Sequence, residues 1–212
     1  MSWPSQVRVA SLRILDLFSG LGGWSAAFKD RGHEVVRIER NYRFGADYCR
    51  DIGALESLDQ FGRFDVILAS PPCENFSVAS IHAHWQGHVP DESAQRSLEL
   101  VRHTIKLIED AKPRFWILEN PRGMLRKLIG KPNATVAYCQ YGLSIMKPTD
   151  LWGILPPSFK PRCCKGGNPD HEAAPRGKTE ALGLQKIAST PERAKVPYQL
   201  SLEVCLACER DL

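Results

Sequence analysis

Short apolar runs recur along the first 120 residues of the chain and predict the strands of a sheet. Each run is rich in aliphatic and β-branched residues and ends in small, polar or proline residues. Runs of this length are typical of strands that are buried on both faces. The predicted strands are Arg13 to Phe18, Glu34 to Glu39, Phe64 to Ser70 and Phe115 to Glu119.

Helical stretches separate these strands. One helix is predicted from Trp24 to Arg31, ended by Gly32, and another from Ser93 to Ala111, with Ser93 as its N-cap. Strands that alternate with helices favour an α/β fold, in which a mostly parallel sheet carries helices on both faces. Ligands of such open sheets bind at the carboxyl ends of the strands.

The pattern changes after about residue 155. Residues 156–183 are rich in Pro, Gly and Lys or Arg and contain few large apolar side chains, which favours an irregular segment without a core of its own. Helical periodicity returns from Glu192 to Glu209. The chain therefore divides into a predicted core (1–155), a basic insertion (156–190) and a C-terminal helix that returns to the core (191–212).

Composition is that of a globular protein, with 43% hydrophobic and 25% charged residues. No apolar stretch reaches the ~20 residues of a membrane span, and the first ten residues contain no apolar signal region. The seven cysteines show no regular disulfide spacing, so we expect reduced thiols and a cytoplasmic protein.

Charge is distributed unevenly along the chain. Residues 1–111 contain 12 Lys or Arg against 15 Asp or Glu, whereas residues 112–212 contain 16 against 9. A basic half suggests a polyanionic partner such as nucleic acid, although a solvated basic surface gives the same count.

A glycine-rich turn follows the first strand and is the first candidate site. The sequence from Asp16 to Gly23, with Phe18, Gly20 and Gly22 between them, lets a ligand approach the backbone closely. Glu39 ends the next strand, where a carboxylate can bind the two hydroxyls of a ribose. Asp51 and Ile52 follow and are predicted to receive an adenine. Together these residues predict an adenosine-containing ligand.

Two further strand ends carry reactive side chains. Cys73 follows Pro71 and Pro72 directly after the third strand, so two rigid residues fix the backbone of a thiol. Glu119 ends the fourth strand, followed by Asn120. A thiol and a carboxylate on two strand ends of one sheet can face a common pocket as nucleophile and acid. A lone cysteine is more often a buried apolar filler, and an acid at a strand end is common.

Three motifs in this order resemble those of the DNA cytosine carbon-5 methyltransferases. They are DLFSGLGG (16–23), PPCENFS (71–77) and ENPRG (119–123). Residues 141–149 take the place of the family's arginine motif, and residues 194–203 resemble its closing helix. The resemblance implies a Rossmann-like fold, S-adenosylmethionine as cofactor and DNA as partner. It also implies that a duplex cytosine swings out of the stack.

The resemblance assigns a role to each of the candidate residues. Cys73 is the nucleophile toward carbon 6, Glu119 engages ring nitrogen 3, and Lys147 polarises the base carbonyl. Residues 78–91 are expected to form a mobile loop that closes over DNA. The cofactor residues implied are Asp16, Phe18, Gly20, Gly22, Gly23, Glu39, Asp51, Ile52 and Pro71. The DNA-contacting residues implied are Ser77, Arg122, Arg126, Arg176 and Lys178.

Some positions depart from the family pattern. Glu74 stands where Gln is usual, and Lys147, Thr149 and Ile145 replace two arginines and a glutamine. Most of the target-recognition region is missing, which resembles the short phage-type members with a HEAAPRG-like stretch, here 171–177. We therefore expect little sequence preference.

Three other functions remain open at this point. The same fold acts on RNA in some relatives, the altered positions near the base suit a modified pyrimidine or transferred group, and a non-catalytic DNA-binding module would keep the fold. Cys73 together with Glu119 argues against the last. Separately, Cys163, Cys164 and His171 are candidate ligands of a structural zinc ion, for which scattered buried thiols are the alternative.

Overall fold

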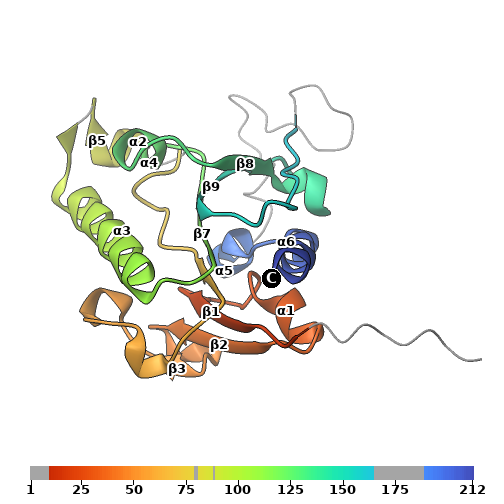
Figure 1. The fold of residues 1–212 in the computed structure, drawn as a ribbon. Helices are drawn as coiled ribbons and strands as arrows, with labels where there is room; N and C mark the ends of the chain where they lie inside the picture. The colour runs from red at the N-terminus through yellow and green to blue at the C-terminus, as the bar shows by residue number, and fades with distance from the viewer. Residues whose placement is uncertain (1–9, 79–80, 88, 165–188) are drawn as a thin grey trace, which may run out of the picture.

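The computed structural model describes residues 10–78, 81–87, 89–164 and 189–212 (Figure 1). Its centre is a seven-stranded sheet in the order β3-β2-β1-β4-β7-β9-β8. The strands of this sheet are β1 (Arg13–Leu17), β2 (Glu34–Glu39), β3 (Tyr48–Cys49), β4 (Val66–Ala69), β7 (Phe115–Pro121), β8 (Ala134–Ala137) and β9 (Pro148–Ile154). The pair β5 (Trp85–Gln86) and β6 (Val89–Pro90) forms a separate hairpin.

The sheet is mostly parallel, as predicted. β1 pairs in parallel with β2 and β4, β2 with β3, and β4 with β7, while β9 lies antiparallel between β7 and β8. The chain moves outward from β1 to β2 and β3, and then crosses back to β4 on the other side of β1. This reversal opens a crevice at the carboxyl ends of β1 and β4, where α/β sheets bind their ligands.

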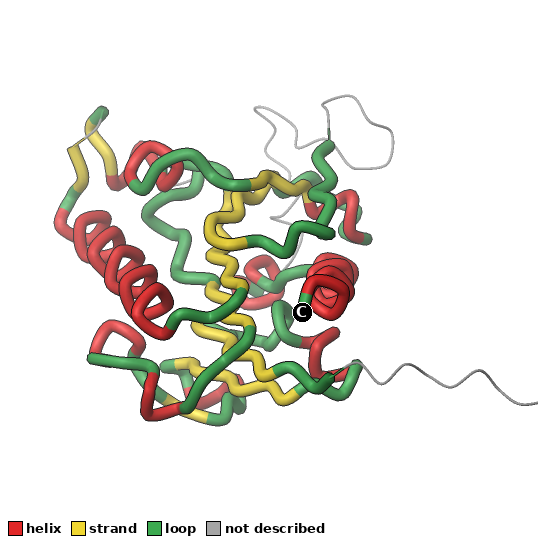
Figure 2. Tube along the Cα trace, viewed as in Figure 1, coloured by secondary structure: helices red, strands yellow, loops and turns green. Residues whose placement is uncertain are grey.

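Helices cover both faces of the sheet (Figures 1 and 2). The long helix α3 (Glu92–Ala111) buries Leu98, Val101 and Ile108 on one face. On the other face, α1 (Ala26–Asp30) and α6 (Tyr198–Asp211) bury Phe28 and Val204. The shorter helices are α2 (Ile81–His84), α4 (Leu125–Leu128) and α5 (Thr190–Ala194), with 3₁₀ turns at Tyr42–Phe44, Ile52–Ala54, Asp59–Phe61 and Tyr138–Tyr141 (η4).

The predicted N-cap of α3 is wrong by two residues. Asp91, in an extended conformation, accepts a hydrogen bond from the Ala94 N–H at 2.7 Å, so the helix begins at Glu92 rather than after Ser93. Both residue types are good caps, and the carboxylate of Asp91 also has the favourable charge for a helix N-terminus. Residues 24 and 25 of the predicted first helix form a turn that precedes α1.

The predicted helix from 192 to 209 is two helices. Ser189 caps α5, which ends at Ala194, and α6 starts after Pro197. A proline disfavours helical backbone at the residue before it, and both Lys195 (ψ 130°) and Pro197 (ψ 138°) have left the helical conformation, so the chain bends there. The bend brings the segment between the two helices against the turn after β1.

The division of the chain outside the core stays a prediction. Residues 156–164 pack on the core, since Phe159 is buried and the Ser158 hydroxyl donates to the Asp211 carboxylate at 2.6 Å. Residues 165–188 of the predicted insertion lie outside the described residues. Among the helices that the structure describes, none is long and apolar enough to span a membrane.

Candidate active site

The glycine-rich turn after β1 has a fixed and locally strained shape. The Gly22 N–H donates to the Ser19 carbonyl at 2.7 Å, which closes the turn. Phe18 has φ +57°, a left-handed conformation that costs a residue with a side chain about 1–3 kcal/mol. From β2, the Arg37 guanidinium donates to the Gly20 carbonyl at 2.6 Å. The strain is therefore held in place by hydrogen bonds from the neighbouring strand.

Glu39 ends β2 directly beside this turn. Its Oε2 accepts a hydrogen bond from the Gly20 N–H at 3.1 Å, and its Oε1 accepts one from the Asn41 N–H at 3.0 Å. A carboxylate oxygen has two lone pairs, so each oxygen retains an acceptor site. The two backbone donors fix the carboxylate at the rim of the crevice, where it can accept two further hydrogen bonds.

The loop after β4 presents Cys73 in a tight turn. The N–H groups of Phe76 and Ser77 both donate to the Cys73 carbonyl at 3.0 Å. The Asn120 side chain, from the end of β7, donates to the Pro71 carbonyl at 3.1 Å. No helix begins at residues 74–78, directly after Cys73, so its thiol does not lie at a helix N-terminus.

Gly123 explains why the loops after β4 and β7 lie so close together. A Cβ atom at this position would lie 2.0 Å from the Phe76 carbonyl oxygen, so only glycine permits the contact. The Met124 N–H donates to the same carbonyl at 2.8 Å, and Ser77 forms an isolated bridge with Gly123. The two sequence motifs that contain Cys73 and Glu119 are therefore one structural unit.

Glu119 is buried between groups from three elements. The Tyr138 hydroxyl donates to Glu119 Oε1 at 2.8 Å. Lys147 Nζ lies 4.5 Å from the centroid of the Tyr138 ring and donates to the Arg193 carbonyl at 3.2 Å. Burial, and then the adjacent Glu119, raise the pKa of Tyr138 well above its ordinary value, so the phenol keeps its proton as a donor.

The surroundings of Cys73 favour the protonated form of its thiol. Burial is the main cause that raises its pKa, and the Glu119 charge acts in the same direction, while the Lys147 ammonium opposes both. The Lys147 cation does not outweigh burial. In the free protein at neutral pH, Cys73 is a thiol that must lose its proton before it can act as a nucleophile.

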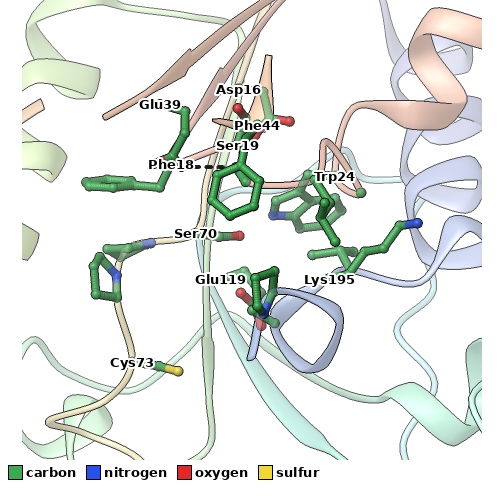
Figure 3. A pocket seen from close by; sticks show the side chains of 18 of the residues that line it. Asp16, Phe18, Ser19, Trp24, Glu39, Phe44, Ser70, Cys73, Glu119 and Lys195 are labelled. Carbon is green, nitrogen blue, oxygen red and sulfur yellow. Dashed lines mark hydrogen bonds between the residues drawn. The ribbon is translucent and has the colours of Figure 1, made fainter. Parts of the chain in front are cut away.

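One pocket joins most of the predicted cofactor and catalytic residues (Figure 3). Cys73 and Glu119 lie on the side of this pocket away from Asp16 and Glu39. The predicted residues that line it are Asp16, Phe18, Gly20, Gly23, Glu39, Asp51, Ile52, Pro71, Cys73, Glu119 and Lys147. Gly22 does not line it; a Cβ there would lie 3.1 Å from the Arg37 guanidinium, so this glycine makes room for the arginine instead.

Four buried polar atoms at this pocket have no hydrogen-bond partner within the described part of the chain. They are Asp16 Oδ1, Ser19 Oγ, Trp24 Nε1 and Ser70 Oγ. Buried polar atoms are rarely left unpaired, because each costs roughly 1–3 kcal/mol. Burial also raises the pKa of Asp16 to about 6, against the Ser25 hydroxyl that donates to its other oxygen at 2.6 Å. The arrangement suits a ligand that brings both donors and acceptors.

The segment before α6 forms another wall of the pocket. A Cβ on Gly23 would lie 2.7 Å from the Val196 carbonyl oxygen, so glycine allows this segment to approach the turn after β1. Ser201 of α6 fixes the approach, since its hydroxyl donates to the Trp24 carbonyl at 2.5 Å. The C-terminal segment therefore returns to the pocket that the predicted cofactor residues line. The residues of α5 and of the segment before α6 that line the pocket are Thr190, Pro191, Ala194, Lys195 and Val196.

Sequence reasoning missed Tyr138, Arg37 and Phe44. Phe44 lines the pocket, whereas Arg37 and Tyr138 support residues that do. Nothing local distinguishes Tyr138 from a core tyrosine at the end of a short strand. Arg37 stands out only as a charge within a β-branched strand.

The predicted DNA-contacting residues differ in their surroundings. Arg122 is exposed, and Ser77 is half-buried at the bridge to Gly123. Arg126 instead donates through Nε to the buried Asp150 carboxylate at 2.8 Å, so the structure gives it a role within the fold. Arg176 and Lys178 lie outside the described residues.

The predicted zinc ligands are only partly described. Cys163 and Cys164 are present, and His171 lies outside the described residues. A different group, His33, Cys205 and Glu209, brings three ligand types together. There Arg31 donates to both Glu209 oxygens at 2.6 and 2.7 Å. Because the guanidinium already pairs with this carboxylate, we interpret the group as a structural clamp between α6 and the chain before β2.

A family model described as C-5 cytosine-specific DNA methylase matches residues 12–136. A curated relative from Frog virus 3 (isolate Goorha), named "Probable DNA (cytosine-5)-methyltransferase", is 29% identical over 93% of the chain and 100% of its own length. The type II methyltransferase M.AplI of Arthrospira platensis is 32% identical, over 56% of the chain and 34% of its own length. The chain thus spans the whole of the viral relative and about a third of the bacterial one.

Among solved structures, a candidate DNA modification methyltransferase encoded within an Escherichia coli prophage has a similar fold. The TM-score is 0.50 at 19% sequence identity, covering 83% of the chain and 63% of that protein. At this level of identity the likeness concerns the fold alone, and it agrees with the predicted Rossmann-like architecture.

Proposed function

The chain belongs to the C-5 cytosine-specific DNA methylase family, and we propose that it transfers a methyl group to carbon 5 of cytosine in DNA through a covalent Cys73 adduct. The observation that carries this proposal is the single pocket that places Cys73, Glu119 and Lys147 beside the glycine-rich turn and Glu39. A nucleophile, an acid and a cation thus share a cavity with a nucleoside-binding edge of the sheet.

The other side of the pocket fits S-adenosylmethionine, which supplies an activated methyl group on its sulfonium. The unpaired Asp16 Oδ1 is an acceptor for its ammonium, and Glu39 is an acceptor for its ribose hydroxyls. Ser19, Ser70 and Trp24 offer unpaired groups in the same wall. Asp51 and Ile52 flank the proposed adenine end.

Cys73, Glu119 and Lys147 each act on a different atom of the base. Cys73 gives up its proton to solvent and its sulfur bonds to carbon 6, while Glu119 donates a proton to ring nitrogen 3, which turns the ring into an enamine with a nucleophilic carbon 5. Lys147 polarises the base carbonyl as this charge develops. After methyl transfer, a solvent base removes the proton from carbon 5, the bond between carbon 6 and sulfur breaks to release Cys73 as a thiolate, and ring nitrogen 3 returns its proton to Glu119.

The substrate must leave the DNA stack to reach this pocket. We propose that residues 78–91 close over it. The described part of this stretch contains α2 and the β5–β6 hairpin, anchored by the Trp85 indole N–H that donates to the Asn75 carbonyl at 2.6 Å. Arg122, Ser77 and the basic insertion with Arg176 and Lys178 are proposed to contact the DNA. Zinc bound by Cys163, Cys164 and His171 stays a prediction.

Mass spectrometry of nucleosides tests the proposal against its rivals. The protein is incubated with labelled S-adenosylmethionine and either unmethylated plasmid DNA or a matched transcript. We expect labelled 5-methylcytosine from the plasmid, spread over many sequence contexts when the sites are mapped. Product from RNA alone, or a different modified pyrimidine, would support the alternatives, and no product from an intact protein would favour a binding module.

Replacing Glu39 with alanine is expected to weaken S-adenosylmethionine binding by roughly 1–3 kcal/mol, the range for leaving a charged hydrogen bond unmade. Isothermal titration calorimetry measures this directly. Glu34→Ala is the matched control, because Glu34 lies on the same strand but is exposed and pairs with Arg13. Equal affinity of Glu39→Ala and wild type would mean that the ribose binds elsewhere.

Cofactor affinity is expected to fall in acid because of Asp16. Burial raises the pKa of this carboxyl to about 6, with Arg37 lowering it and Glu39 raising it to a smaller extent. Only the ionised form attracts an ammonium, so the dissociation constant should rise about tenfold from pH 7 to pH 5 by linkage. Calorimetry across this range measures it. Asp16→Asn should bind weakly with no such slope; a flat profile in the wild type would contradict the assignment.

A further inference from the structure

Tyr138 stands behind Glu119, outside the lining of the pocket. It lies where β8 meets η4 and has no exposed surface. Its hydroxyl donates to Glu119 Oε1 at 2.8 Å, and its N–H donates to the Lys147 carbonyl at 3.1 Å. One residue therefore contacts two of the three groups that act on the base.

The environment of this hydroxyl makes it a permanent donor. Burial and the neighbouring Glu119 raise the pKa of Tyr138, so the proton stays on the phenol. The Thr149 hydroxyl also interacts with the phenol and lies within hydrogen-bond distance of the Lys147 carbonyl, at 3.3 Å. Thr149 itself is fully buried. Thr149 and Tyr138 thus form a neutral support for Glu119, next to the Lys147 cation.

We propose that Tyr138 is a positioning residue, which holds the Glu119 carboxyl so that Oε2 carries the proton and delivers it to the base. Because Oε1 accepts from the buried phenol, Oε2 is the oxygen left for the pocket. The inference rests on the proposed function.

The test compares Tyr138→Phe with Tyr141→Phe. The first variant keeps the ring over which Lys147 lies and removes only the hydroxyl. Tyr141 is an equally buried tyrosine on the same 3₁₀ turn, but its hydroxyl accepts from the Arg162 N–H at 2.9 Å and does not touch Glu119. Tyr141→Phe therefore measures the effect of removing a buried hydroxyl that does not contact Glu119.

We expect kcat of Tyr138→Phe to fall roughly 10- to 100-fold with little change in KM for DNA, the range for losing a hydrogen bond to a charged group. The alkaline limb of the pH–activity profile should move to higher pH, because the lost bond favoured the ionised carboxylate. Cys73 and Lys147 face the same carboxyl and are unchanged in both variants. Tyr141→Phe should keep the wild-type kcat and profile.

Several outcomes would overturn the inference. One is a Tyr138→Phe variant with the kcat and pH profile of Tyr141→Phe while the wild type is active. If Tyr138→Phe does not bind S-adenosylmethionine with wild-type affinity, Thr149→Val replaces it in the test. For Thr149→Val we expect a smaller fall in kcat and a pH shift in the same direction. An unchanged pH profile of Thr149→Val also rejects the inference. An inactive wild type rejects both this inference and the proposed function.

Discussion

Replacing Cys73 with alanine is expected to abolish methyl transfer, with a fall of more than about 1,000-fold, because no other thiol lines the described pocket to attack carbon 6. The variant should still bind S-adenosylmethionine, since the proposed cofactor contacts lie on the far side of the pocket (Figure 3). Labelled methyl transfer to plasmid DNA measures the first effect, and calorimetry measures the second.

Cys49→Ala is the control, because Cys49 is exposed on β3 and does not line the pocket. DNA that contains 5-fluorocytosine sharpens the test, since fluorine cannot leave carbon 5 as a proton does. Wild-type protein should then form an adduct that survives denaturant, and Cys73→Ala should not. Full turnover by Cys73→Ala would remove the covalent mechanism altogether.

Much of this site was predictable because its residues lie at strand ends. β1, β2, β4 and β7 are short runs rich in aliphatic and β-branched residues, and the turn after each one must meet its neighbours at the same edge of a parallel sheet. Phe18, Glu39, Cys73 and Glu119 all follow from that single rule. The ENPRG and PPCENFS motifs did not predict that Gly123 allows their two loops to touch. That contact depends on how closely Gly123 approaches the Phe76 carbonyl oxygen, which the sequence does not show.

The parts that sequence reasoning missed depend on contacts between distant residues. β9 contains a proline, an aspartate and a glycine, and its buried Asp150 pairs with Arg126 and accepts from the Thr135 hydroxyl. Tyr138 is 19 residues from Glu119, and no local pattern joins them. The predicted start of α3 was wrong because Asp91 and Ser93, two residues apart, are both good N-caps.

Glu119→Gln is expected to lower kcat by roughly 100- to 10,000-fold, the range for losing a positioned general acid. The amide has nearly the same shape and can still accept from the Tyr138 hydroxyl, so the packing around it should persist. It can also donate an N–H to ring nitrogen 3, but it cannot transfer a proton. Single-turnover kinetics on DNA separates this chemical defect from weaker binding.

The expected fall should therefore appear in kcat, with the dissociation constant for DNA within a fewfold range of the wild type. Asp150→Asn is not a suitable control, because it would disturb β9, so Tyr141→Phe is used again.

If Glu119→Gln kept wild-type kcat, hydrogen bonding alone would suffice at ring nitrogen 3. Tyr138 would then orient a hydrogen bond rather than direct a proton. If kcat falls while the rate of adduct formation with 5-fluorocytosine falls in parallel, the proton from Glu119 is needed for the attack by Cys73. The thiolate and the acid then act in one step, which accounts for the single rigid unit that Gly123 makes of their two loops.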